Sequence, residues 1–227
     1  MIPAGPRTGG PAAAAADAAG SAGAGGGAPF APRGAVDFGV DVSEWQDGLP
    51  MAEVARTGCS FAVVRACDGT YADRCFASHV AGARANGLEV AAYWYLRRPS
   101  EGTSFAEQAG AVIQQLAAAG AGATPVWLDC ETPARLAADE VRDAAAALRD
   151  AGAVVAGMYT MRSYWRLRPA PDLGADWLAQ WPGGAGYPGD DHRAWRPFRG
   201  RRPVMWQFTD SAAIAGFRVD VSARRSA

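Results

Sequence analysis

The sequence predicts an α/β fold in the form of a single barrel, with about eight strands and fewer helices in its last third. From residue 37 onward, short apolar runs alternate with amphipathic segments of helical period, which is the rhythm of βα units. The chain has 227 residues, and 49% of them are hydrophobic, so it can bury one substantial core or one barrel at the small end of that class. Several apolar runs end in an acidic residue, and a parallel barrel gathers the carboxyl ends of its strands on one face.

Eight apolar runs are the strand candidates. Each is short, and turn-forming residues separate it from the neighbouring segments. The runs cover residues 38–42, 61–66, 89–95, 125–130, 154–159, 175–180, 203–208 and 217–221.

Helix candidates fall between the first five strands, where capping residues mark their ends. Asp73 lies just before one helical segment, and Ser104 with Glu107 forms a capping box at the start of another. Glycines follow the last residues of all three segments, as is common at helix ends. The predicted helices cover residues 75–86, 104–120 and 138–151.

The helix signals fade after residue 165, and residues 182–202 are rich in Gly, Pro and Arg, which predicts a long surface loop. The loop carries Arg196, Arg199, Arg201 and Arg202, which we interpret as solvated side chains, with contact to an anionic polymer as the alternative. The formal net charge is −1, so the chain has no global basic field to attract nucleic acid.

Residues 1–36 consist mainly of Ala, Gly and Pro, and we expect them to be disordered because they bury too little apolar surface. Residues 37–227 then form the barrel domain. An ordinary signal peptide is not supported, since Asp17 interrupts the Ala run, although a misassigned start codon would also produce such a tail. No run approaches the roughly 18 consecutive apolar residues of a membrane span.

The cysteines do not have the spacing of a zinc site, and a domain of this size does not depend on disulfides. With two histidines in the chain, a His-built metal centre is not expected either. We therefore predict no metal and no cofactor. The four thiols are interpreted as buried small hydrophobes, with a pairing of Cys67 left open; they are Cys59, Cys67, Cys75 and Cys130.

Asp129 and Glu131 are the strongest candidates for catalytic residues. They end the apolar run over 125–130, and residues two apart on a strand share a face, with Cα atoms about 6.5 Å apart. A strand terminator or a helix cap is the alternative explanation, but neither requires two acids on one face at a buried strand end, where desolvation is costly.

Asp41 and Asp220 also follow or interrupt apolar runs, near the two ends of the predicted barrel. If all strand ends meet on one face, these two acids join Asp129 and Glu131 in a single cleft. For either residue alone, a strand terminator or a helix cap is the favoured explanation.

Aromatic residues gather at the same strand ends as the acids. Flat aromatic faces stack on the C–H face of a pyranose, although the same side chains also fill cores. The residues predicted to contact a sugar are Tyr93, Trp94, Tyr159, Trp206 and the neighbouring Gln207.

From about residue 37 to 224, the chain resembles the lysozymes of glycoside hydrolase family 25, which are bacterial and phage muramidases. Five motifs occur in the family's order, and together they are far more specific than a lone Asp-x-Glu. The motifs are residues 39–46, 61–70, 87–93, 128–131 and 206–220.

The resemblance implies a flattened β/α barrel that cuts the β-1,4 bond between N-acetylmuramic acid and N-acetylglucosamine in peptidoglycan, without metal or organic cofactor. It implies that Glu131 protonates the leaving oxygen, that Asp129 lies beside the anomeric carbon, and that Asp41 and Asp220 complete the floor. Asp129 either attacks directly or orients the 2-acetamido group of the substrate, and the shared strand favours the second route. We expect a monomer that acts outside the cell or in the cell wall.

The chain departs from the family at two positions. Trp94 replaces a common His, and Ser222 stands where Asn is frequent. Because neither change removes a carboxylate, activity is expected and substrate preference is open. A catalytically idle barrel that binds glycans is the second hypothesis, and an amidase or peptidase would lack its expected metal ligands or Cys/His pair.

Overall fold

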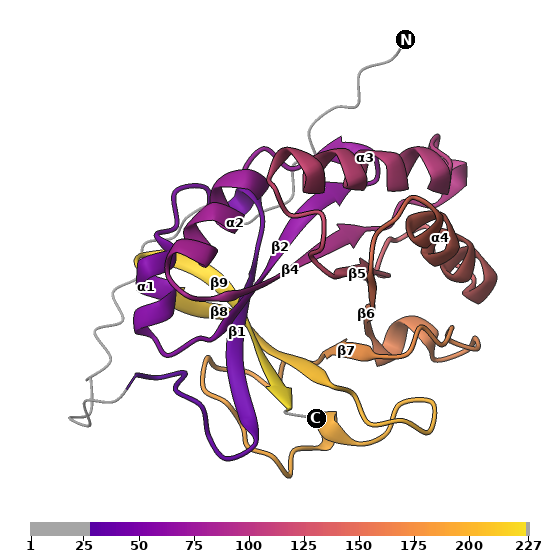
Figure 1. The fold of residues 1–227 in the computed structure, drawn as a ribbon. Helices are drawn as coiled ribbons and strands as arrows, with labels where there is room; N and C mark the ends of the chain where they lie inside the picture. The colour runs from indigo at the N-terminus through magenta and orange to yellow at the C-terminus, as the bar shows by residue number, and fades with distance from the viewer. Residues whose placement is uncertain (1–27, 226–227) are drawn as a thin grey trace.

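The computed structural model describes residues 28–225, which form a closed eight-stranded barrel (Figure 1). The barrel order is β1-β9-β8-β7-β6-β5-β4-β2, and pairing of β1 with β2 closes it. The two-residue strand β3 (Tyr71–Ala72) extends the end of β2 as a short hairpin. The barrel strands are β1 (Val36–Val42), β2 (Phe61–Asp68), β4 (Glu89–Tyr95), β5 (Val126–Asp129), β6 (Val155–Met161), β7 (Asp176–Ala179), β8 (Met205–Ile214) and β9 (Phe217–Arg225).

All barrel neighbours pair in parallel except at β9, which runs antiparallel to both β8 and β1. A tight turn at Ala215 and Gly216, both with positive φ, joins β8 to β9. The first residues of β9 therefore lie at the same end of the barrel as the carboxyl ends of the parallel strands. In the β1–β9 register, Asp41 lies directly opposite Asp220.

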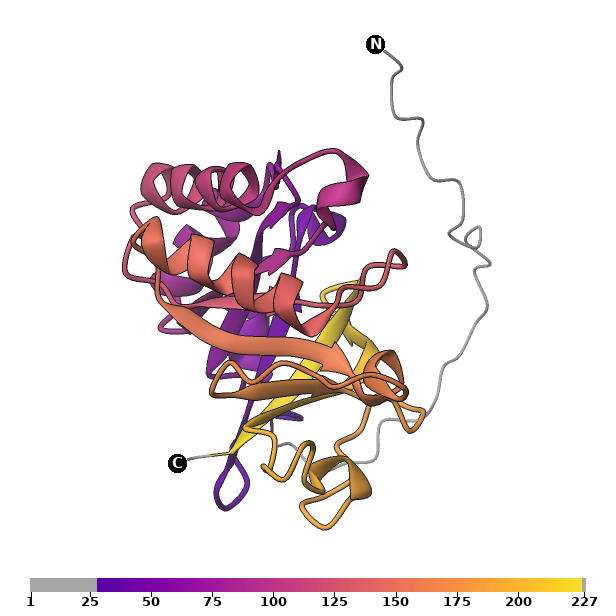
Figure 2. The ribbon, with the colours of Figure 1, turned by 90° about the vertical axis from the view of Figure 1, so that its right-hand side faces the viewer.

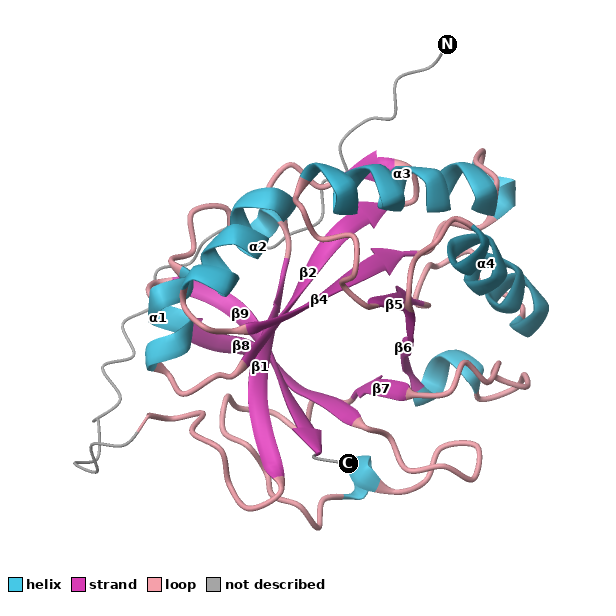
Figure 3. Cartoon of the chain, in the orientation of Figure 1, coloured by secondary structure: helices cyan, strands magenta, loops and turns pink. Residues whose placement is uncertain are grey.

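The α-helices cover one side of the barrel, and loops cover the other (Figures 2 and 3). Helix α2 packs on β2 and β4, α3 packs on β2, and α4 packs on α3 and β6. After α4, the described chain contains only 3-10 turns between its strands, as the fading helix signals predicted. The α-helices are α1 (Met51–Arg56), α2 (Phe76–Ala85), α3 (Phe105–Ala118) and α4 (Ala138–Asp150); the 3-10 turns are η1 (Glu44–Gln46), η2 (Pro99–Glu101), η3 (Arg162–Trp165) and η4 (Arg193–Trp195).

The predicted strands and the three predicted helices are confirmed, but the last two strands are longer than predicted: β8 continues past residue 208 to Ile214, and β9 continues past residue 221 to Arg225. The short helix α1 was not predicted, because it begins at Pro50 without a side-chain cap and spans less than two turns. The prediction that Asp73 caps α2 is wrong: the N-cap is Cys75, without a side-chain cap, and the Asp73 carboxylate instead accepts a hydrogen bond from the Cys75 amide at 2.8 Å, just before the helix. All four cysteines are buried and free.

The hydrophobic core has two parts because strand side chains alternate between the two faces. The larger part fills the space outside the barrel, under the helices and loops. The smaller part fills the barrel interior, where the Trp177 ring lies edge-on to both Tyr159 and Trp127, with centroids 4.5 and 5.8 Å apart. This aromatic layer forms a plug across the barrel.

The predicted tail over residues 1–36 lies mostly outside the described residues. Within the described part, Phe30 is buried against Phe38 and Phe208, so packing begins before the predicted domain boundary. No described helix has both the length and the apolar character needed to cross a membrane.

Gly157 in β6 makes room for the aromatic plug. A Cβ at this position would lie 2.7 Å from Trp127 Cζ3 and would also contact the Ala175 carbonyl oxygen. We predict that Gly157→Ala lowers the free energy of unfolding by about 1–3 kcal/mol, because neither neighbour has space to move. Gly110→Ala in α3 is the control: it has open space around it, and it should raise stability by about 0.5–1 kcal/mol. Urea unfolding measures both, and equal effects of the two changes would contradict the packing argument.

Candidate active site

The four predicted acids meet in one small pocket of about 80 Å³ at the carboxyl end of the parallel strands. Tyr93, Tyr159 and Gln207 line the same pocket, as the sequence predicted. Trp177, which the sequence did not single out, completes the wall. The full lining is Asp41, Tyr93, Asp129, Glu131, Tyr159, Trp177, Gln207 and Asp220.

Each acid reaches the pocket because of its place on a strand. Asp41 lies near the end of β1, Asp129 ends β5, and Glu131 follows two residues later on the same face. Asp220 arrives differently from the prediction: it lies near the beginning of β9, and the antiparallel direction of that strand brings it opposite Asp41. The expectation that the acids converge is thus met by a mixed barrel instead of an all-parallel one.

Gln207 connects the acids to the aromatic walls. Its Nε2 donates to both Asp41 carboxylate oxygens at 2.9 and 3.0 Å, and to Asp220 Oδ2 at 3.3 Å. Its Oε1 accepts hydrogen bonds from the Tyr159 hydroxyl at 2.9 Å and from Trp181 Nε1 at 3.0 Å. These partners fix the orientation of the amide, with its donors toward the carboxylates.

Burial and mutual repulsion raise the pKa values of the four acids. Burial raises the pKa of Glu131 to about 6, with a further contribution from the charge of Asp220. Burial also raises the pKa of Asp220 to about 6, and the nearby Asp210 adds to the effect. No arginine of the described chain forms an ion pair with any of the four acids, so these charges have no direct cationic partner.

Asp41 and Asp129 lie deepest, and burial raises the pKa of both carboxyls well above the usual value. The charge of Asp220 raises the pKa of Asp41 further, whereas hydrogen bonds from Gln207 lower it by less than burial raises it. The charge of Glu131 raises the pKa of Asp129 next after burial. Hydrogen bonds therefore do not hold the pKa values of these two acids low.

Asp129 has an unusual environment even among these acids. Its Oδ1 atom is fully buried and has no hydrogen-bond partner among the described residues. The nearest guanidinium that favours its ionised form belongs to Arg65, which is already bound to Asp73 at 2.7 Å and to Glu44 at 3.0 Å. A buried, unpaired carboxyl oxygen is costly, and it is suited to a hydrogen bond that only a ligand supplies.

Trp94 and Trp206 do not reach the pocket, which corrects their predicted contact with a sugar. Both side chains are fully buried and belong to the core outside the barrel. The alternation along β4 and β8 explains the result, because Tyr93 and Gln207 point inward and their neighbours must point outward. Trp206 instead donates from Nε1 to the Gln180 carbonyl at 2.8 Å and stacks on His192.

A wider hollow of about 480 Å³ opens beside the acid pocket, and Glu131, Tyr159 and Asp220 line both. Trp45 and Trp181 stand at this hollow, and Trp45 is 80% exposed. The sequence did not single these two out as ligand contacts, although Trp45 lies within the first family motif. Two exposed aromatic faces beside an acid pair are suited to stacking on sugar rings.

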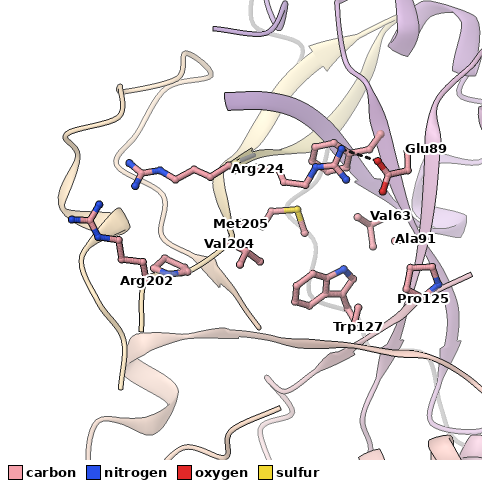
Figure 4. Close-up of a pocket in the computed structure, with 13 residues that line it drawn as sticks. Val63, Glu89, Ala91, Pro125, Trp127, Arg202, Val204, Met205 and Arg224 are labelled. Carbon is pink, nitrogen blue, oxygen red and sulfur yellow. Dashed lines mark ion pairs between the residues drawn. The ribbon is translucent and has the colours of Figure 1, made fainter. Parts of the chain in front are cut away.

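A separate cavity of about 420 Å³ lies at the opposite end of the barrel, below the aromatic plug (Figure 4). Its walls are mainly apolar, with Trp127, Met205 and Val63 on the inside. Its one carboxylate, on Glu89, forms an ion pair with Arg224 at 2.8 Å. This cavity therefore lacks the acid pair that general acid catalysis of glycoside cleavage requires.

The family model of glycosyl hydrolases family 25 matches residues 40–217, which is most of the chain. The chain belongs to this family. It is therefore a glycoside hydrolase, and the acid pocket of this family 25 chain is its candidate active site. A search of curated proteins found no match.

Solved structures of the same architecture support the assignment of the fold. A bacterial lysozyme from Streptomyces coelicolor is 24% identical, with a TM-score of 0.62 over 84% of this chain and 92% of that one. A glycosyl hydrolase 25 of Streptococcus pneumoniae is 19% identical, with a TM-score of 0.67 over 83% and 86%. A GH25 lysozyme from Aspergillus fumigatus is 18% identical, with a TM-score of 0.63 over 85% and 95%.

The raised pKa of Glu131 predicts a pH-dependent cost to stability. A carboxyl whose pKa is higher in the folded than in the unfolded chain favours the folded state most at low pH, and this contribution is lost as the pH rises through about 6. We predict that, as the pH rises from 4 to 7.5, the free energy of unfolding of the wild type falls by about 1–2 kcal/mol relative to that of Glu131→Gln. Urea unfolding at both pH values measures the difference. Asp143→Asn, on an exposed position of α4, is the control, and a difference of the same size there would argue against a special role of the pocket.

Proposed function

We propose that the acid pocket cleaves the β-1,4 bond between N-acetylmuramic acid and N-acetylglucosamine, with retention of configuration. The chain is a peptidoglycan hydrolase by family, and the bond and the mechanism are the further steps proposed here. The observation that carries the proposal is the pairing of Glu131 with Asp129 in one buried pocket, at the edge of an open hollow with aromatic walls.

Glu131 is the proposed general acid. Glycoside cleavage needs a protonated carboxyl beside the leaving oxygen, and burial raises the pKa of Glu131 to about 6. Glu131 also lines both the inner pocket and the outer hollow. A glycan lying in the hollow would therefore place its bridging oxygen within reach of this side chain.

Asp129 is proposed to lie beside the anomeric carbon. Its unpartnered Oδ1 is suited to accept a hydrogen bond from the N–H of a 2-acetamido group, which would turn the acetamido oxygen toward C1. Direct attack by Asp129 is the alternative. The deep burial of this carboxyl favours the substrate-assisted route, because an acceptor role does not require the side chain to reach the sugar carbon.

Asp41, Asp220 and Gln207 are proposed to form the floor of the site. Their hydrogen bonds hold two carboxyls near the place where positive charge develops on the sugar ring in the transition state. Tyr93 and Tyr159 complete the wall. The hydroxyl of Tyr159 is bound to Gln207, so its ring has a fixed position beneath a bound sugar.

The proposed site of action is the bacterial cell wall or the extracellular space, and the proposed working unit is a monomer. An endolysin from a bacteriophage of Listeria monocytogenes, 17% identical to this chain, shares the fold with a TM-score of 0.65. Wall lysis agrees with that similarity.

Glu131→Gln should abolish release of reducing sugar from purified peptidoglycan, because an amide cannot donate the required proton. In the wild type, kcat/KM should decline on the alkaline side near pH 6, where Glu131 loses its proton. Reducing-sugar release with a parallel turbidity assay measures both. Near-normal turnover in the variant would refute the role of Glu131, and wall binding by the wild type without sugar release would favour the idle glycan-binding barrel.

Asp129→Asn should lower kcat by about 10²–10³-fold if the carboxylate stabilises charge in the transition state, while KM changes little. The variant should fold at least as stably as the wild type, since it removes a buried carboxyl with an unpaired oxygen. Steady-state kinetics on soluble glycan fragments measures the loss. A decrease below tenfold would assign Asp129 a structural role.

A further inference from the structure

Three arginines gather beside the acid pocket, in the segments that follow β5 and β6. Arg135, Arg166 and Arg168 line a hollow of about 470 Å³ together with Ser163, Tyr164 and Leu167; we refer to it as the arginine hollow. The two segments lie side by side because β5 and β6 are neighbours in the barrel. All three arginines are exposed.

The charges of the arginine hollow have no acidic partner within the described chain. None of its three guanidinium groups lies within ion-pair distance of a described carboxylate, whereas Arg199, Arg201 and Arg218 each form an ion pair with an aspartate. Arg135 is held in place by a hydrogen bond from Nη1 to the Tyr164 carbonyl at 2.8 Å, and it lies over the Tyr164 ring. The hollow thus presents concentrated positive charge on a partly fixed framework.

The arginine hollow is joined to the catalytic acid. A smaller hollow of about 220 Å³ shares Arg135, Ser163 and Tyr164 with it, and Glu131 and Thr132 line the other end of the smaller hollow. Glu131 also borders the hollow that contains Trp45 and Trp181. Glu131 therefore lies between the hollow of the exposed tryptophans and a smaller hollow that adjoins the arginines.

We infer that the arginine hollow binds carboxylates of the stem peptide that is attached to the lactyl group of muramic acid. The inference rests on the proposed function. The acetylated sugar rings are neutral and offer nothing for three unpaired guanidinium groups, whereas the peptide branches from the sugar beside the scissile bond and carries acidic groups. Arginine forks match carboxylates in geometry and charge. Leu167 is 89% exposed at the same hollow and provides an apolar contact for peptide side chains.

Such a site would make the enzyme prefer glycan that carries peptides. Because the arginines lie at the rim, they would act mainly on substrate association, and their contribution would weaken as salt is added. The preference should therefore be larger at low ionic strength than at high ionic strength.

The test compares Arg166→Gln/Arg168→Gln with the control Arg142→Gln/Arg149→Gln, which removes the same charge from exposed positions of α4. Each protein is assayed by reducing-sugar release on two soluble substrates, peptide-bearing glycan strands and the same strands stripped of peptide by an amidase. Because the amidase exposes the lactyl carboxylate, the stripped strands are first converted to the lactyl amide, which removes that charge. The readout is the ratio of kcat/KM on the two substrates, at low and at high salt. We expect the ratio to fall about five- to tenfold in the test variant at low salt, mainly through KM, and to stay unchanged in the control.

An unchanged ratio in Arg166→Gln/Arg168→Gln, with normal sugar release by the wild type, would overturn this inference and leave the proposed function intact. No sugar release by the wild type on either substrate would overturn both this inference and the proposed function.

A third substrate consists of strands freed of wall phosphate polymers by acid treatment. If the effect of the variant follows the phosphate instead of the peptide, the assignment to peptide carboxylates is wrong.

Discussion

The burial of four carboxyl groups at one end of a closed barrel is the main constraint that the rest of the structure must offset. Asp41, Asp129, Glu131 and Asp220 repel one another in a pocket without a direct cationic partner, and burial adds a further cost to each charge. The apolar core around the barrel and the aromatic plug inside it supply the stability that offsets this cost. The same repulsion favours retention of a proton near neutral pH, which is what an acid catalyst requires. The repulsion that destabilises the folded chain is therefore also the one that would suit the pocket to the proposed acid catalysis.

The uneven cover of the barrel shapes the cleft. Helices α2, α3 and α4 pack on one side, and the last third of the chain crosses the other side as loops and 3-10 turns. The segments after β1, β5, β6 and β7 border the hollows that meet at Glu131. Loops rise above a strand end without the bulk of a helix, so a long polymer can cross the site instead of entering it end-on.

The strands could be predicted from the sequence because their apolar runs are short and well separated. Asp129 and Glu131 could be found because they share a strand face. The direction of β9 could not, since a run such as 217–221 looks the same in a parallel and an antiparallel strand. The sequence motifs located Trp94 and Trp206 in the chain but did not show which face of the strand they occupy. Because side chains alternate along a strand, the inward position of Tyr93 and Gln207 places both tryptophans on the outside. Trp181 lies outside the predicted site because its link to Gln207 joins residues 26 positions apart.

Gln207 of β8 connects strands of the barrel to the acids of the candidate site. Its amide joins the carboxyls of β1 and β9 to the hydroxyl of β6, so strands from both ends of the described chain set the floor of the site together. The final hairpin, β8 with β9, joins the rest of the sheet through β1 on one edge and the short strand β7 on the other. Partial release of that hairpin on heating would disperse the acids while the helices still hold the other half of the sheet. Thermal inactivation of this enzyme would then precede the loss of its helical signal.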